Sequence, residues 1–403
     1  MEQHAQQPPW PLTLSTFLSF ARPITEVSVL SSVEYVFAEI PRRLASRARS
    51  LEALPFIVGM NPFIARTLQA YRRSFQFLTM HPPVKTLQEN AFFAVQLEAF
   101  VQSHANDIPT MAKGFQECSR YMTPEQISEF LDGAIRNRIA MRLIAEQHIA
   151  LSRSLMQKEN SRDHLGIVHM SCSPRDTICM CGSFVSELCE ATLGASPKII
   201  IDGEIDATFA YIPVHLEYIL TEILKNAFRA TVERHHKLYA SATSTPPIPP
   251  VVITISPPPP LTSHARVGPA FLSMRIRDEG GGVPSANMGR IFSYSFTTAG
   301  RGAEDSLEDA DNGLGGGPYA AQHVGGSAAV DGNGGTGGLF TEMTGRSLQM
   351  GLGTIAGLGY GLPMSRLYAR YFGGSLDFLS LEGWGSDVFL KLRDLNDAGD
   401  AEI

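Results

Sequence analysis

The stretch Glu222-Ile-Leu-Lys-Asn226-Ala-Phe-Arg229-Ala-Thr lies inside a longer run, His215 to Arg234, that has the apolar period of a helix. Its apolar stripe consists of Leu216, Ile219, Leu220, Ile223, Leu224 and Ala227. Spacings of four and three residues place Glu222, Asn226 and Arg229 near one face of this helix. A carboxylate, a carboxamide and a guanidinium in one row can hold a hydroxyl, a metal ion and a phosphate. A solvated face with an ordinary Glu/Arg pair is the alternative interpretation.

Two glycine motifs farther along the chain favour a nucleotide site. Asp278 closes a predicted strand beside Gly280 and Gly282. Its carboxylate can accept a hydrogen bond from an exocyclic amine, and the glycine backbone leaves space for a flat ring. Both properties suit adenine. The second motif opens a predicted helix, whose N–H groups and positive terminus can bind phosphates. It consists of Gly357, Leu358, Gly359, Tyr360, Gly361 and Leu362.

Three further residues complete the candidate site. Asn226 is a candidate Mg²⁺ ligand, since Mg²⁺ keeps several waters and takes few protein ligands. Thr297 and Thr298 can donate their hydroxyls to a phosphate, or can be ordinary turn or strand residues. The G-x-G-x-G pattern also occurs in dinucleotide-binding proteins. However, no βαβ unit with an acidic residue about twenty positions on follows it here, which argues against that class.

Composition bounds the class of protein. The chain has 403 residues, enough for two or three domains, with 44% hydrophobic and 18% charged residues. A net charge of −7 argues against a general nucleic-acid binder. Five cysteines, unevenly placed, indicate a reducing compartment, and Cys179-Met-Cys181 lacks the second pair that a zinc site would need. No apolar run reaches the length of a membrane span, and the first residues resemble neither a presequence nor a secretory signal.

Helical patterns dominate residues 12–160, which we predict to form a four-helix up-down bundle. The predicted helices are Val33–Leu51, Pro62–Leu78, Thr86–Val101 and Thr123–Ser154. The last of them carries a polar set consisting of Arg138, Arg142, Glu146 and His148, which we interpret as structural salt bridges. We expect His148 to organise the bundle against the second domain.

Residues 165–395 are predicted to form an α/β sandwich with a mixed sheet and one layer of helices. The predicted strands lie at 198–202, 208–212, 251–256 and 271–277, and a hairpin follows at 374–392. Residues 236–268 are Pro-rich and are predicted to be a surface insertion on a hairpin. Residues 300–353 are Gly-rich and are predicted to be a long flexible lid.

The order E-x-x-x-N, D-x-G-x-G and G-x-G-x-G resembles the Bergerat ATP-binding fold of DNA gyrase and the histidine kinases. More narrowly, the motifs that begin at Glu222, Asp278 and Gly357 resemble those of the mitochondrial 2-oxo acid dehydrogenase kinases. This family comprises the pyruvate dehydrogenase kinases and the branched-chain 2-oxo acid dehydrogenase kinase. The run from Arg138 to His148 resembles the last bundle helix of the family, and the likeness covers nearly the whole chain except the two insertions.

The resemblance implies a protein serine kinase that phosphorylates the E1α subunit of a dehydrogenase complex and switches the complex off. It implies a regulatory bundle that binds the lipoyl domain of E2, followed by a Bergerat-type ATP-binding domain. It also implies a homodimer in the mitochondrial matrix that uses ATP and Mg²⁺, with K⁺ as a further candidate ion. By position, Glu222 would be the general base, Asn226 the Mg²⁺ ligand and Asp278 the adenine-binding residue, with Arg229 near the nucleotide.

Some positions depart from the family pattern. Tyr218 stands where many pyruvate-specific members carry His, and branched-chain members also have Tyr at this position. By contrast, the segments at 291–298 and 367–374 look closer to the pyruvate type. The C-terminal Asp-Trp element of the pyruvate kinases is not visible in residues 394–403. Two functions from other classes remain open, namely a sensor histidine kinase and a non-catalytic ATP-gated scaffold. The substrate is predicted to be pyruvate dehydrogenase, with the branched-chain enzyme as the alternative.

Overall fold

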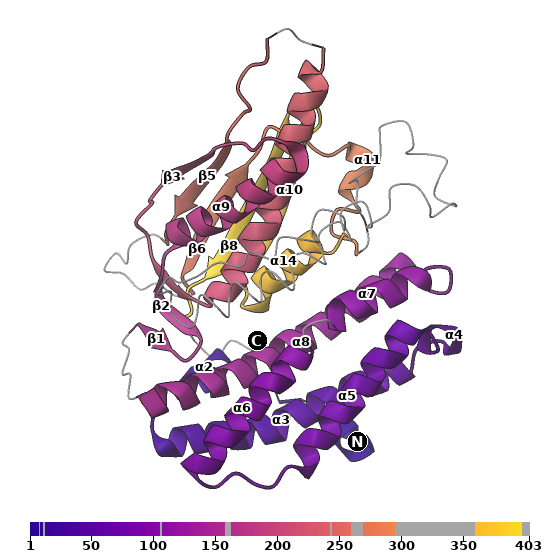
Figure 1. The fold of residues 1–403 in the computed structure, drawn as a ribbon, viewed down its shortest axis with the longest axis vertical. Coiled ribbons are helices and arrows are strands. Elements are labelled where there is room, and N and C mark those ends of the chain that lie inside the picture. Colours follow the sequence, from indigo (N-terminus) through magenta and orange to yellow (C-terminus); the bar gives the residue numbers. More distant parts are fainter. Residues whose placement is uncertain are drawn as a thin grey trace.

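The computed structural model describes residues 1–7, 9–10, 13–104, 107–157, 163–241, 244–258, 269–294, 296 and 359–396. It combines a helical N-terminal part with a mixed α/β part, as the sequence predicts (Figure 1). The N-terminal elements are α1 (Glu2–Gln6), α2 (Leu14–Ser19), α3 (Glu26–Glu52), α4 (Phe56–Gly59), α5 (Pro62–Met80), α6 (Leu87–Ser103), α7 (Asp107–Glu117) and α8 (Pro124–Gln157). Of these, the three short helices α1, α2 and α4 and the longer helix α7 were not predicted from the sequence.

The long helices of the N-terminal part pack around a common apolar core, with α3 against α5 and α8, α6 against α8, and α5 against α7. Helix α3 begins at Glu26 and not at Val33 as predicted. The earlier start follows from a capping box, in which Thr25 Oγ1 accepts from Ser28 N and Ser28 Oγ accepts from Thr25 N. The backbone N–H groups of Thr25 and Ser28 thereby both find acceptors.

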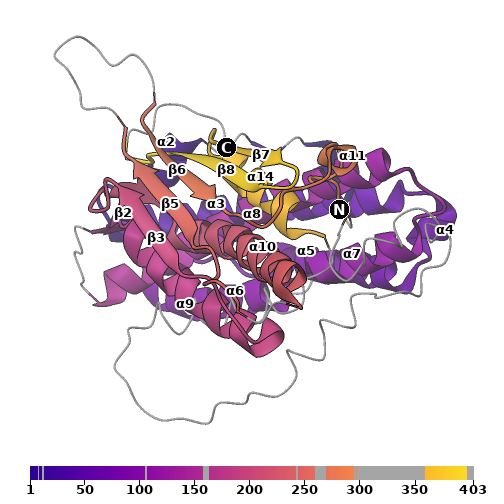
Figure 2. The ribbon, with the colours of Figure 1, turned by 90° about the horizontal axis from the view of Figure 1, so that it is seen from above.

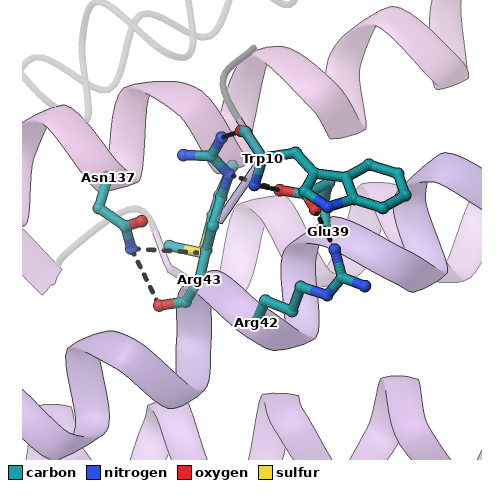
Figure 3. Close-up of polar contacts among 6 residues, drawn as sticks. Trp10, Glu39, Arg42, Arg43 and Asn137 are labelled. Atoms are coloured by element: carbon teal, nitrogen blue, oxygen red, sulfur yellow. Dashed lines mark hydrogen bonds and ion pairs between the residues drawn. The ribbon is translucent and has the colours of Figure 1, made fainter. Parts of the chain in front are cut away.

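The N-terminal arm is fastened to α3 through a buried carboxylate (Figure 3). Glu39 is fully buried, and its Oε2 accepts from the backbone N–H of Trp10 at 3.2 Å while its Oε1 accepts from Arg42 at 3.0 Å. Arg43 donates to the Trp10 carbonyl at 3.0 Å, and the guanidinium of Arg42 lies 4.6 Å from the centre of a Trp10 ring. Asn137 of α8 donates to the Arg43 carbonyl, which joins α8 to the same cluster.

The α/β part contains β1 (His164–Leu165), β2 (Val168–Cys172), α9 (Pro174–Leu193), β3 (Ile199–Gly203), β4 (Phe209–Tyr211), α10 (Pro213–Tyr239), β5 (Val251–Ser256), β6 (Phe271–Arg277), α11 (Ser285–Met288), α14 (Gly361–Tyr371), β7 (Ser375–Leu381) and β8 (Gly385–Arg393). Five of the strands form a sheet in the order β3-β5-β6-β8-β7, in which only β3 and β5 are parallel. A smaller antiparallel sheet has the order β1-β2-β4.

Buried and accessible residues alternate along β5, β6 and β8, which shows that one face of the five-stranded sheet is buried. Helices α9 and α10 lie side by side over it (Figure 2), and α14 packs against α10 and β7. The predicted strands at 251–256 and 271–277 are confirmed with their bounds. The first residues of the predicted Pro-rich insertion, through Tyr239, continue helix α10, and β5 is an inner strand of the sheet.

Helix α14 lies between the sheet and the helical part (Figure 1) and packs against α8. The Tyr294 hydroxyl, from the loop after α11, donates to Asp132 of α8 at 2.5 Å. On α14, the Tyr368 ring lies 4.7 Å from the ring of His215 in the first turn of α10. None of the helices that the structure describes combines the length and apolarity needed to cross a bilayer.

Candidate active site

Three residues of α10 form a row that faces two glycine motifs. Glu222, Asn226 and Ala230 are spaced four apart, so they follow one side of the helix. At one end of the row, a Cβ built on Gly361 would lie 2.1 Å from Glu222 Oε2. At the other end, a Cβ built on Gly280 would lie 2.4 Å from the Ala230 Cβ. The structure therefore places parts of all three predicted motifs along a single helix.

The Glu222 carboxylate is buried, with 4% of the residue exposed. Its Oε1 accepts from Lys225 Nζ at 2.9 Å, and the Lys225 side chain is itself only 12% exposed. Arg229 pairs with Glu233 at 2.6 Å, and about half of each of these side chains is accessible to solvent. The ion pair that involves Glu222 is thus made with Lys225, which the sequence analysis did not single out.

Asn226 follows Glu222 by one turn, and its side chain is exposed. An exposed carboxamide oxygen beside a buried carboxylate can bind a cation that keeps much of its hydration shell, so the free-energy cost of desolvating the cation is small. The donor chemistry of Asn226 therefore fits a Mg²⁺ ion that keeps most of its waters.

Asp278 is 7% exposed at the end of β6. Its Oδ1 accepts from the N–H groups of Gly280 at 2.7 Å and Ser386 at 3.3 Å. Burial raises the pKa of Asp278 to about 6, although these two N–H groups lower it. With Oδ1 held by backbone donors, Oδ2 can accept from an exocyclic amine. The lack of a side chain at Gly280 lets this loop approach Ala230 of α10 closely.

Arg234 of α10 holds the loop that follows Asp278. Its guanidinium donates to the carbonyl of Glu279 at 3.0 Å, to that of Gly383 at 2.5 Å and to that of Trp384. The last two acceptors belong to the turn between β7 and β8. One side chain thus joins α10, the Asp278 loop and the hairpin turn, and this contact was not predicted from the sequence.

Gly282 and Gly359 both need the conformational freedom of glycine. Gly282 has φ +73°, and a Cβ there would lie 2.4 Å from the carbonyl oxygen of Leu381. Gly359 also has φ +73°, and its Cβ would lie 2.4 Å from the carbonyl oxygen of Phe296. Of the other predicted site residues, Tyr360 is buried and Leu362 lies in the first turn of α14. Thr297, Thr298, Gly357, Leu358 and the segment 300–353 lie outside the described residues.

His148 lies away from this row, in the interior of the helical part. It is 1% exposed, its Nδ1 lies 2.7 Å from Ser32 Oγ of α3, and its Nε2 lies 3.5 Å from Ser152 Oγ. Asn90 of α6 donates to the same Ser152 hydroxyl. Burial lowers the pKa of His148 to about 4. These contacts link helices within the N-terminal part, whereas we expected His148 to organise that part against the second domain.

The other three residues of the predicted polar set on α8, namely Arg138, Arg142 and Glu146, make structural contacts. Arg142 pairs with Glu146 at 2.6 Å, and Arg138 donates to the His104 carbonyl at 2.6 Å. The interpretation of this polar set as salt bridges is therefore confirmed for Arg142 and Glu146.

Comparisons with known proteins find similarity to one group of mitochondrial kinases. Residues 11–169 match the family described as mitochondrial branched-chain alpha-ketoacid dehydrogenase kinase. The chain is 29% identical over 391 residues to the mitochondrial pyruvate dehydrogenase (acetyl-transferring) kinase of Arabidopsis thaliana, an alignment that covers 96% of this chain and 91% of the relative. It is 26% identical to kinase 1 of Saccharomyces cerevisiae and 28% identical to human isozyme 3, with 98% of this chain and 86% of each relative covered. The chain is therefore similar, over nearly its whole length, to mitochondrial 2-oxo acid dehydrogenase kinases.

Proposed function

We propose that this protein is an ATP-dependent protein serine kinase that phosphorylates and inactivates the E1α subunit of a mitochondrial 2-oxo acid dehydrogenase complex. The observation that carries the proposal is the row on α10, where Glu222 adjoins Gly361 and Ala230 adjoins Gly280. Relatives over nearly the full chain are named as pyruvate dehydrogenase kinases, which supports this activity. We assign pyruvate dehydrogenase as the substrate and the mitochondrial matrix as the location.

Each site residue then has a role. Glu222 accepts the proton of the substrate serine, and Asp278 accepts a hydrogen bond from the adenine amine beside Gly280 and Gly282. The segment Gly357–Leu362 binds the phosphates. Thr297, Thr298 and Arg229 lie near the nucleotide. Asn226 holds Mg²⁺, which when bound neutralises charge on the phosphates. Because phosphoryl transfer needs mainly positioning and charge neutralisation, this set of residues suffices for the reaction.

The finer architecture is part of the proposal. We assign residues 12–160 to a four-helix-bundle domain that binds the E2 lipoyl domain, and residues 165–395 to a Bergerat-type ATP-binding domain. Helices α9, α10 and α14 on one face of a mixed sheet support the second assignment. Residues 300–353 would be the lid over the nucleotide, and K⁺ remains a candidate ion.

A homodimer is proposed from the sheet face that none of the described helices covers. Leu379 and Leu381 on β7 are 60% and 68% exposed, and Phe389 on β8 is 39% exposed. Beside them, Arg275 and Asp387 form a paired-donor salt bridge at 2.8 and 3.0 Å. An apolar face edged by charges of both signs suits a self-complementary contact with a second copy.

The branched-chain enzyme is the second candidate substrate, and two observations favour it. Residues 11–169 match the branched-chain kinase family, and Tyr218 occupies the position one turn before Glu222 that it also occupies in branched-chain members. Against this, the relatives aligned over the full chain are named as pyruvate dehydrogenase kinases.

The test is incubation with labelled ATP and purified pyruvate or branched-chain E1, side by side. Acid-stable phosphoserine on E1α, with loss of E1 activity, is the expected result, and the E1 that is labelled faster identifies the substrate. Acid-labile phosphate on the chain itself would indicate a sensor histidine kinase. ATP binding without transfer would indicate a non-catalytic scaffold.

A further inference from the structure

The Glu222 carboxylate is confined on two sides. Lys225, three residues later on α10, donates to Oε1 at 2.9 Å, and the first residue of α14, Gly361, lies against Oε2. Both side chains of the ion pair are largely buried, at 12% and 5% exposure. In such surroundings a charge pair is screened little by water, so it fixes geometry far better than a surface pair does.

The residue one turn before Glu222 does not hold it. The Tyr218 hydroxyl donates to the sulfur of Met364 at 3.5 Å, and its ring lies 5.1 Å from that of Tyr368. Tyr218, Tyr368 and Tyr294 lie near one another on this side, and burial raises the pKa of Tyr218, so its hydroxyl stays neutral. In the described part of the chain, Lys225 is the cation that contacts the Glu222 carboxylate.

Resting on the function proposed above, we propose that Lys225 is a positioning residue that orients Glu222 for proton transfer. Lys225 occupies Oε1, so the incoming serine meets Oε2. Glu222 Oε2 takes the hydroxyl proton as the serine oxygen bonds to the γ-phosphorus. The bond from that phosphorus to the bridging oxygen breaks, and its electron pair leaves with ADP. Lys225 touches neither reactant, and it acts by fixing which carboxylate oxygen is available.

Gly361 supports the same geometry. A Cβ at residue 361 would lie 2.1 Å from Oε2 and 3.5 Å from the Cβ of Glu222. Such a close approach forces the carboxylate to rotate, because 2.1 Å is far inside van der Waals contact. The bare backbone at Gly361 is thus what leaves Oε2 in place while Lys225 holds the other oxygen.

The test compares Lys225→Met and Lys225→Arg with the matched control Lys237→Met, an exposed lysine farther along α10. For each chain, kcat, the KM for ATP and the pH dependence of kcat are measured with E1, along with ADP affinity. We expect Lys225→Met to lower kcat by roughly 10- to 100-fold, since a positioned base contributes about 100-fold or more, with the KM for ATP within about twofold.

The pH profile separates positioning from a merely structural role. A carboxylate that loses a neighbouring positive charge holds its proton more tightly, so the acidic limb of kcat should move to higher pH in Lys225→Met. Lys225→Arg should restore kcat and the wild-type limb, and Lys237→Met should leave both unchanged. If Lys225→Met does not fold, Lys225→Gln, which keeps a donor without the charge, replaces it with the same expectation.

An unmoved acidic limb in an otherwise folded, ADP-binding Lys225→Met would overturn the inference, as would a shift of that limb in Tyr218→Phe alone. Full activity of Lys225→Met beside an active wild type would refute the positioning role and leave the proposed function intact. A wild-type chain that transfers no phosphate to either E1 would refute the proposed function and this inference together.

Discussion

Gly280 and Ala230 approach so closely that a Cβ on the glycine would lie 2.4 Å from the Cβ of the alanine. This contact presses the loop after Asp278 against α10, two turns beyond Glu222. The loop after the predicted adenine-binding residue therefore meets the helix of the predicted base through two residues that carry almost no side chain. A larger residue at either position must move the loop or the helix.

We expect Gly280→Ala to destabilise the fold by about 1–3 kcal/mol, the usual cost of overpacking, and to weaken ADP binding. Ala230→Gly in the same chain should restore part of both losses. The rescue is incomplete, since the new Cβ also lies 2.8 Å from the backbone carbon of Ala230 and 2.9 Å from Asp278 Oδ1. Urea unfolding and ADP titration measure the two quantities. Additive effects of the two substitutions would contradict the contact.

Glu222→Gln should bind ATP and fail to transfer phosphate. The amide keeps the size of the side chain but cannot take the serine proton, so the loss falls on kcat. Calorimetric ADP titration and phosphorylation of E1 check the two halves of the prediction. Unchanged phosphorylation by Glu222→Gln would refute the assignment of Glu222 as the base.

Asn226→Ala should abolish metal-dependent turnover, because the exposed carboxamide is the proposed Mg²⁺ ligand. Asn226→Asp keeps an oxygen ligand at the same position and should retain part of the turnover. The measurement is the initial rate of E1 phosphorylation across a Mg²⁺ titration. If the alanine variant needs no more Mg²⁺ than the wild type, Asn226 is not a ligand.

Adenine nucleotide affinity should fall as the pH drops through about 6, where the pKa of Asp278 lies. Above this pH both carboxylate oxygens can accept, and below it a proton on Oδ2 removes the acceptor that faces the amine. ADP titrations from pH 5 to pH 8 provide the measurement. In Asp278→Asn the affinity should be lower and should no longer change near pH 6. A wild-type affinity that does not change across this range would contradict the adenine role.

Glu217 lies on α10 near Cys181, whose thiol donates to its backbone carbonyl. The side chain is 7% exposed, its Oε2 has no partner in the described residues, and burial raises its pKa from 4.5 to about 7. The folded state therefore holds this proton more tightly than the unfolded chain. The resulting stability is present below pH 4.5 and is lost as the pH rises through about 7.

Glu217→Gln should remove this loss. We expect unfolding free energies close to wild type at pH 5 and a gain on the order of 2 kcal/mol at pH 8. Glu187→Gln, on the exposed surface of α9, is the control and should show no such pH-dependent gain. A wild-type-like stability of Glu217→Gln at pH 8 would contradict the burial argument.

Much of the fold was readable from periodicity. Helix α10 was predicted from His215 to Arg234 and spans Pro213–Tyr239, since its apolar stripe is long and unbroken. The strands β5 and β6 were predicted with their bounds, because alternation and flanking prolines delimit them. Helix α9 was missed despite Ser173 as its N-cap, since Gly182 and the cysteines weaken the helical pattern.

The site was readable as a set of residues and not as a set of contacts. Spacing on α10 puts Glu222 and Asn226 on one side, but it does not decide between Lys225 and Arg229 as the partner of the glutamate. That choice depends on which side α14 covers. Arg234 illustrates the same limit more strongly, because two of its acceptors lie 149 and 150 residues away and no local pattern indicates them.

All the oxygens that Arg234 binds are main-chain carbonyls. A guanidinium that binds only backbone carbonyls does not depend on which side chains the acceptor residues carry. The residues at 279, 383 and 384 can therefore be substituted, within the backbone conformations that the turn permits, without loss of these hydrogen bonds to Arg234. Tolerance to substitution around the proposed nucleotide site should accordingly be uneven, high at the three acceptor residues and low at Arg234.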